Sequence, residues 1–150
     1  MTIKIDIGSP SEKKTFHLEA SLEPFIGKKL GSKVKGESIK EFPFNDYEFE
    51  ITGASSISGH PLIKNISGTG LKKVLLEHGK GLKKKPRKEG KKMRAYSDPR
   101  GLRMKKTVHA NLITGDIMQV NLKVTKAGSN SIAKILGKEE KAEEKPVESQ

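Results

Sequence analysis

Thirteen lysines and arginines lie between residues 79 and 106, where only Glu89 and Asp98 are acidic. This stretch carries a charge of +11 in a chain whose formal net charge is +12. Cations at this density repel one another unless an anion compensates them, and phosphate is the anion that they bind best. The stretch therefore predicts a polyanion-binding segment. Its candidate binding residues are Lys80, Lys83, Lys84, Lys85, Arg87, Lys88, Lys91, Lys92, Arg94, Arg100, Arg103, Lys105 and Lys106.

Glycines and prolines interrupt this basic segment so often that no regular helix can run through it, and we expect a long, flexible loop. The breakers also exclude the amphipathic basic helix that binds membranes. Tyr96 is its only aromatic residue, whereas proteins that read single strands stack several aromatic rings on bases. The expected partner is therefore a folded RNA, contacted through its backbone and shape.

Catalytic and metal-binding chemistry has little support in the sequence. Residues 31–38 nearly match a phosphate-binding P-loop, but Glu37 stands where the loop needs lysine. Glu48 and Glu50 share the polar face of a predicted strand and have no apolar pocket around them. We therefore predict no enzyme, cofactor, metal or small-molecule substrate. Four histidines, expected to be at the surface or partly buried, are too widely spaced for a paired metal site: His17, His60, His78 and His109.

The composition fits one domain with a modest core. The chain has 150 residues, of which 33% are apolar and 32% charged, so part of it is expected to stay outside the core. Cysteine is absent, which excludes disulfides. The first residues lack the apolar run of a signal peptide, and no stretch is apolar enough to cross a membrane. We expect a soluble cytoplasmic protein that is a monomer when free.

Short alternating stretches that must position the basic segment dominate the rest of the sequence. Residues 71–78 fit either a helical face or a strand, so their conformation stays open at this point. Residues 53–59 read as a polar loop, and residues 131–136 as a short helix capped by Ser129 or Asn130. Met118, Val120, Leu122 and Val124 are expected to face inward. The predicted strands span residues 2–7, 13–19, 47–52, 107–113 and 117–125.

The predicted fold class is mainly β: a small β-barrel-like domain with short helices, covering residues 1–137. The basic RNA-binding loop of residues 79–106 interrupts it. Residues 138–150 contain five glutamates and three lysines with almost nothing apolar, which predicts a disordered acidic tail.

Several segments together resemble the archaeal and eukaryotic family of small-subunit ribosomal protein six. They are GLKKVLLEHGKG, PRKEGKKMR, KKTVHANLITGDIMQVNLKVTKAG and SIAKILG, and the resemblance extends to Gly137. It implies a β-rich, barrel-like protein on the body of the small ribosomal subunit, bound to ribosomal RNA beside other ribosomal proteins. It also implies a strand at residues 71–76, with residues 83–92 and 103–106 facing the RNA.

The chain departs from the family in places. Residues 106–111 lack an arginine that the family usually has there, and residues 96–102 lengthen the basic loop. The long basic C-terminal helix and serine cluster of eukaryotic members are missing, which indicates an archaeal-type member. The leading hypothesis is a structural ribosomal protein that takes part in translation. The alternative is a general RNA-binding or RNA-modification accessory protein built on a similar barrel.

Overall fold

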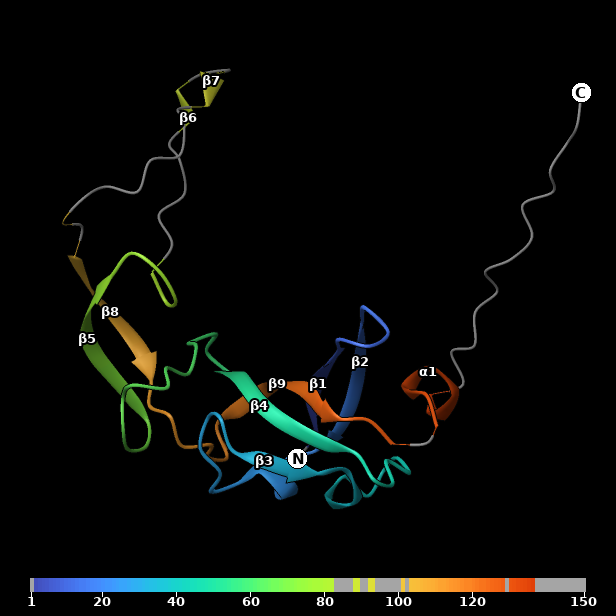
Figure 1. The fold of residues 1–150 in the computed structure, drawn as a ribbon. Coiled ribbons are helices and arrows are strands. Elements are labelled where there is room, and N and C mark those ends of the chain that lie inside the picture. Colours follow the sequence, from blue (N-terminus) through green and yellow to red (C-terminus); the bar gives the residue numbers. More distant parts are fainter. Residues whose placement is uncertain are drawn as a thin grey trace, which may run out of the picture.

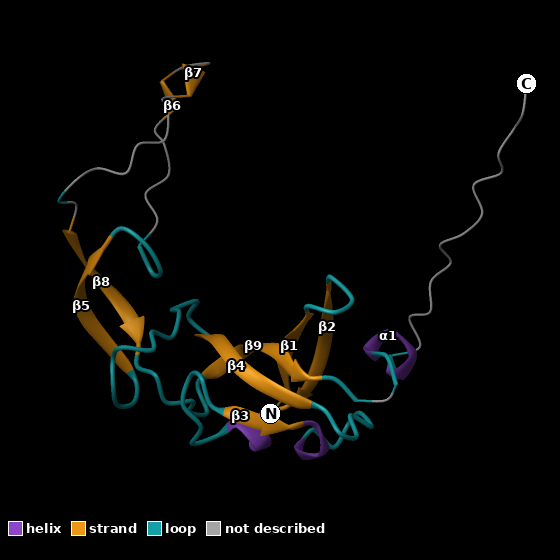
Figure 2. Ribbon diagram, viewed as in Figure 1, coloured by secondary structure: helices purple, strands orange, loops and turns teal. Residues whose placement is uncertain are grey.

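The computed structural model describes residues 2–82, 88–89, 92–93, 101, 103–128 and 130–136. The described chain is mainly β and forms a five-stranded sheet and two separate two-stranded sheets (Figures 1 and 2). The strand order in the large sheet is β2-β1-β9-β4-β3. Its residues include the first and the last strand of the described chain, so the sheet is completed by segments far apart in the sequence.

The N-terminal hairpin pairs β1 (Thr2–Ser9) with β2 (Lys14–Ser21) in antiparallel register, as the alternating sequence predicts. Ile3, Ile5 and Ile7 are buried on one face of β1. On its other edge β1 pairs in parallel with β9 (Ile117–Lys126), so that Ile5 lies opposite Val120. The last strand of the fold thus lies at the centre of the sheet.

Strand β4 (Glu48–Ser56) pairs antiparallel with β9 and, along its other edge, with the short β3 (Lys33–Lys35). It continues through Gly53 to Ser56, so the predicted polar loop at residues 53–59 is wrong for its first four residues. The sequence pattern alone did not reveal this extension, because the segment is rich in small and polar residues that rank low as strand formers.

Met118 does not face the core as predicted: it is exposed, and Ile117 is buried instead. Ser55 pairs with Gln119 and Ser56 with Ile117, which leaves Met118 as an extra residue opposite β4. Such a β-bulge shifts the alternation of side chains by one position. The inward prediction holds for Val120, Leu122 and Val124, which lie beyond the bulge.

The core covers one face of the large sheet. Its aromatic part consists of Phe44, Tyr47 and Phe49. The ring centroids of Phe44 and Phe49 are 5.5 Å apart, and Tyr47 stacks on Phe49. Two short 3₁₀ helices, η1 (Glu23–Phe25) and η2 (Gly36–Ser38), close it at the edge. Phe25 is fully buried. This packed layer holds the large sheet in place, and the strand pair of β5 (Leu71–Glu77) and β8 (Arg103–His109) is attached to that sheet.

The short helix α1 (Ile132–Ile135) is fastened to the same core, and its cap is Ser131 rather than Ser129 or Asn130. Ile132 is only 1% exposed, and its N–H donates to Glu12 Oε1 at 3.2 Å. The Tyr47 hydroxyl donates to the Asn130 carbonyl. The described end of the chain is therefore attached to the β1–β2 turn and to Tyr47, the residue that precedes β4.

The ambiguous segment is a strand: β5 (Leu71–Glu77) pairs antiparallel with β8 (Arg103–His109), and we call this pair the ribbon. Strand β8 begins four residues before the predicted start and ends before the predicted end at residue 113. Arg103, Lys105 and Lys106 are therefore strand residues rather than part of a loop. Figure 1 shows the ribbon standing beside the large sheet.

Residues 61–62 connect the ribbon to the large sheet through isolated bridges from Pro61 to Ser55 and from Leu62 to His109. His109 is 1% exposed at this junction, so the expectation of a surface or partly buried histidine is wrong for it. Its Nδ1 lies 2.9 Å from the Ala110 carbonyl oxygen. The described strands form open sheets linked by these bridges and not a closed barrel, so the barrel-like closure stays a prediction.

Candidate nucleic-acid interface

The basic segment leaves and returns through the ribbon. After β5, a tight turn folds the chain back, with the Gly79 N–H donating to the Leu82 carbonyl at 2.9 Å and the reverse bond at 3.1 Å. Gly81 has a φ of +90°, and a Cβ there would lie 3.0 Å from Ile63 Cδ1. Glycine thus allows Leu82, only 4% exposed, to anchor the start of the segment.

Lys80 lies on this turn and is exposed, and its Nζ lies 3.4 Å from the Thr52 carbonyl oxygen of β4. The segment returns at Arg103, the first residue of β8. Within it, β6 (Lys88–Glu89) and β7 (Lys92–Met93) pair as a short antiparallel hairpin. The two paired strands β5 and β8 therefore fix both ends of the basic segment next to each other.

The structure brings several of the thirteen predicted cations together on β8. Arg103, Lys105 and Lys106 are all exposed there. The Arg103 Nη2 lies 3.0 Å from the Glu77 Oε1 across the ribbon. Among the described residues, Lys105 and Lys106 have no acidic partner. The predicted cations that lie outside the described residues are Lys83, Lys84, Lys85, Arg87, Lys91, Arg94 and Arg100.

Two cations of β5, Lys72 and Lys73, were missed by the sequence analysis because the helical alternative left their direction undefined. Both are exposed. The Lys72 Nζ donates to the Ser67 carbonyl at 2.7 Å, while Lys73 has no hydrogen-bond or ionic partner among the described residues. Lys72 lies opposite Val108 and Lys73 opposite Thr107, so the two lysines add positive charge to opposite sides of the ribbon.

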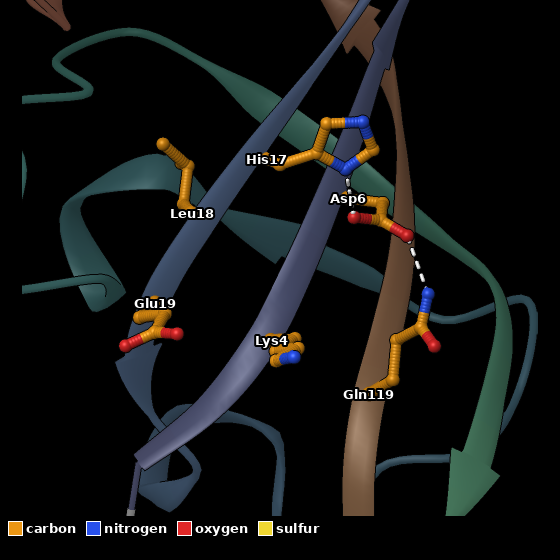
Figure 3. Close-up of a pocket in the computed structure, with 6 residues that line it drawn as sticks. All are labelled: Lys4, Asp6, His17, Leu18, Glu19 and Gln119. Atoms are coloured by element: carbon orange, nitrogen blue, oxygen red, sulfur yellow. Dashed lines mark hydrogen bonds and ion pairs between the residues drawn. The ribbon is translucent and has the colours of Figure 1, made fainter. Parts of the chain in front are cut away.

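Apart from the basic segment, polar side chains also line a shallow depression on the open face of the large sheet, over β1, β2 and β9 (Figure 3). Asp6 lies at its centre, with His17 Nδ1 2.5 Å from one carboxylate oxygen and Gln119 Nε2 donating to the other. Lys4 faces Glu19 across the strands. Because cationic, acidic and amide side chains are mixed there, the depression has no concentration of positive charge like that of the ribbon.

Titration and metal chemistry are sparse in the described chain. Burial, and secondly the negative charge of Glu12, raise the pKa of Tyr47 above its ordinary value. No group of three acidic or histidine side chains among the described residues could hold a metal ion. In the same part of the chain, no helix is long and apolar enough to span a bilayer.

The fold and its charges define a class: a mainly β protein whose central sheet carries a strongly cationic ribbon and insertion. The chain belongs to the ribosomal protein S6e family, whose model matches residues 3–137. It is 33% identical over 138 residues to the small ribosomal subunit protein eS6 of Methanocaldococcus jannaschii. The alignment covers 92% of this chain and 93% of the relative.

Two further relatives carry the same name. The small ribosomal subunit protein eS6 of Methanospirillum hungatei is 32% identical, with 87% of both chains covered. That of Haloarcula marismortui is 26% identical, covering 89% of this chain and 93% of the relative. These matches confirm the resemblance that the sequence indicated. The strand that the resemblance implied at residues 71–76 is confirmed by β5.

Proposed function

We propose that this protein is a structural constituent of the small ribosomal subunit in the cytoplasm, without catalytic activity, and that it binds folded ribosomal RNA through the basic segment. The observation that carries this proposal is the attachment of that segment to two paired strands, which present its charge at one place. Residues 1–137 act as one domain with a barrel-like body, next to other ribosomal proteins. Residues 138–150 lie outside the described residues and form its acidic tail.

Electrostatics support the choice of partner. The basic segment carries +11 of the formal net charge of +12. In the described part, exposed cations of β8 stand without acidic partners, apart from Arg103 beside Glu77. Unpaired surface cations at this density destabilise the free protein and are neutralised by polyphosphate backbones. The free protein is a monomer because its own charge repels a second copy.

Salt dependence tests this mechanism directly. If the segment neutralises roughly six to ten phosphates, its affinity for small-subunit RNA should fall about a thousandfold or more between roughly 50 and 200 mM salt. Affinity is measured with a fluorescently labelled RNA fragment of the small subunit. An affinity that changes little with salt would contradict binding through the basic segment.

Charge removal localises the contact. Replacing five cations of the segment by alanine should weaken RNA binding and leave the urea unfolding curve unchanged. A matched variant removes five exposed lysines from the body of the protein and should bind almost as well as the wild type. Equal losses in both variants would argue for unspecific attraction. The segment variant changes Lys83, Lys84, Lys85, Arg87 and Lys88; the control changes Lys4, Lys29, Lys33, Lys35 and Lys40.

Sedimentation of a cell extract separates the ribosomal role from that of a general RNA-binding accessory protein. A structural constituent remains with the small subunit at salt concentrations that remove loosely bound proteins. A protein that stays at the top of the gradient would favour the accessory role instead.

A further inference from the structure

The ribbon has a solvent-facing side whose composition differs from an ordinary strand surface. Because side chains alternate along a strand, alternate residues of β5 share one side with their partners on β8. Lys73 lies opposite Thr107, Leu75 opposite Lys105, and Glu77 opposite Arg103. His109, opposite Leu71, is the buried end of this side. We call the rest of the side the ribbon face, and it consists of Leu71, Lys73, Leu75, Glu77, Arg103, Lys105 and Thr107.

Leucines on the ribbon face are exposed to an unusual degree. Leu71 is 52% and Leu75 57% exposed, although both belong to a regular pair of strands, Leu71 at its first position and Leu75 within it. The other side of β5 packs instead: Leu76 lies half-buried next to the Gly81 turn and the fully buried Val108. The ribbon therefore packs on the protein only near Val108 and Leu76, since Lys72, Met104 and Lys106 on that side are exposed. The cationic and aliphatic side lies in solvent.

The cations on the ribbon face are available for a ligand. Lys73 and Lys105 are diagonal neighbours, which places their Cα atoms about 7 to 8 Å apart. Neither has an acidic partner among the described residues, in contrast to Lys72, whose ammonium group is held by the Ser67 carbonyl on the opposite side. Arg103 is paired with Glu77, but both side chains are more than 60% exposed, so this pair is weak and easily exchanged.

We propose that the ribbon face docks into the minor groove of an RNA duplex. Lys73, Lys105 and Arg103 would contact phosphates on either side of the groove, and Leu71 and Leu75 would pack against the sugars between them. This inference rests on the proposed function and names the form of RNA that one surface recognises. It concerns the described ribbon rather than the insertion between its strands.

The shape of RNA favours this groove. The minor groove of A-form RNA is wide and shallow and displays ribose 2′-hydroxyls, whereas its major groove is too deep and narrow for side chains to read. A two-stranded ribbon with short aliphatic side chains and no aromatic ring on its face fits a shallow surface and cannot stack on unpaired bases. Thr107 supplies a hydroxyl in the middle of the face, where a 2′-hydroxyl can accept or donate a hydrogen bond.

Charge distinguishes this occupant from a protein partner. Three cations and one carboxylate lie on the ribbon face, and the strands continue directly into the basic segment. An apolar patch that binds protein is normally depleted of lysine at its centre. Here Lys105 lies directly opposite the exposed Leu75. The combination complements a polyanion that also presents apolar sugar surface.

The test uses the full-length protein and three probes of one sequence: an RNA hairpin duplex, the corresponding DNA duplex and the unpaired RNA strand. Leu71→Thr/Leu75→Thr keeps good strand formers and should weaken binding to the RNA duplex about tenfold without changing the salt slope. Lys73→Gln/Lys105→Gln should weaken binding and lower the salt slope by about two. Wild-type protein should bind the RNA duplex at least tenfold more tightly than the DNA duplex at equal salt.

The control for the leucine variant is Ile26→Thr/Ile57→Thr, which changes two aliphatic residues that are 54% and 63% exposed away from the ribbon. It should bind like the wild type. Equal binding of RNA and DNA duplexes, or preference for the unpaired strand, would overturn the minor-groove proposal.

Failure of this proposal can be told apart from failure of the proposed function. If the leucine variant binds the RNA duplex like the wild type while the basic-segment variant loses binding, the ribbon face does not contact RNA but the proposed function stands. That result would direct attention to a neighbouring ribosomal protein as occupant of the face. If neither variant changes RNA binding, both proposals are wrong.

Discussion

Ile132 anchors α1 to the core, and its replacement by alanine is a direct test of how the described end of the chain is held. The side chain is 1% exposed and belongs to the main hydrophobic cluster. Truncating a buried isoleucine to alanine removes transfer free energy and leaves a cavity, at a typical cost of 2 to 5 kcal/mol. Because the helix lies at the edge of the core and can partly collapse onto the cavity, we expect about 3 kcal/mol.

That loss is a large part of the stability of a domain of this size, which is about 5 to 15 kcal/mol. It should lower the melting temperature by roughly 10 °C and shift the midpoint of urea unfolding without changing its slope. Circular dichroism in the far ultraviolet follows both transitions. The matched control is Ile57→Ala, since Ile57 is 63% exposed and its truncation should cost no more than about 0.5 kcal/mol.

The reasoning is refuted if Ile132→Ala costs less than about 1 kcal/mol, or no more than the control. Either result would mean that α1 does not pack against the sheet in solution. A variant that unfolds with a smaller urea slope would point instead to loss of the two-state transition.

Two other substitutions probe the same body of the protein. Gly36→Ala places a Cβ 2.2 Å from the Phe44 carbonyl oxygen, so it should lower the free energy of unfolding in urea by about 3 kcal/mol. The control Gly115→Ala has open space around it and should cost under about 0.5 kcal/mol. Similar values for the two variants would contradict the close approach at Gly36. Tyr47→Phe should cost about 1 kcal/mol near neutral pH through the lost hydrogen bond to a backbone carbonyl. The pKa of Tyr47 is raised in the fold, so the wild type loses its extra stability as pH rises above the unfolded-state pKa of about 10. The difference in unfolding free energy between the two proteins should therefore shrink at high pH. A constant difference would show that the tyrosine is not desolvated.

Alternation of side chains predicted the N-terminal hairpin and most of β9 because each strand has one face in the core. It failed at Met118, where one extra residue in β9 exchanges the two faces. A bulge depends on how two distant strands pair, and nothing local in the sequence marks it. The parallel pairing of β1 with β9 was unpredictable for the same reason, since a period of two does not name a partner.

The candidate interface was predictable in its charge and not in its geometry. Counting cations found the basic segment, but residues 71–78 fitted both a helix and a strand, so Lys73 and Leu75 had no assigned side. Pairing with β8 resolves this, and it turns Arg103 to Lys106 from a loop into a strand. The exposure of Leu71 and Leu75 runs against the usual assumption that leucines in an amphipathic stretch face the core.

The central place of β9 affects how quickly the protein folds. During synthesis β1 and β4 emerge long before β9, and each lacks its neighbour on one edge until residues 117–126 have been made. Pairing between strands so distant in sequence folds slowly, and unpaired strand edges are prone to aggregate. The cationic insertion is also translated before the sheet is complete, so the nascent chain carries most of its positive charge while still unfolded.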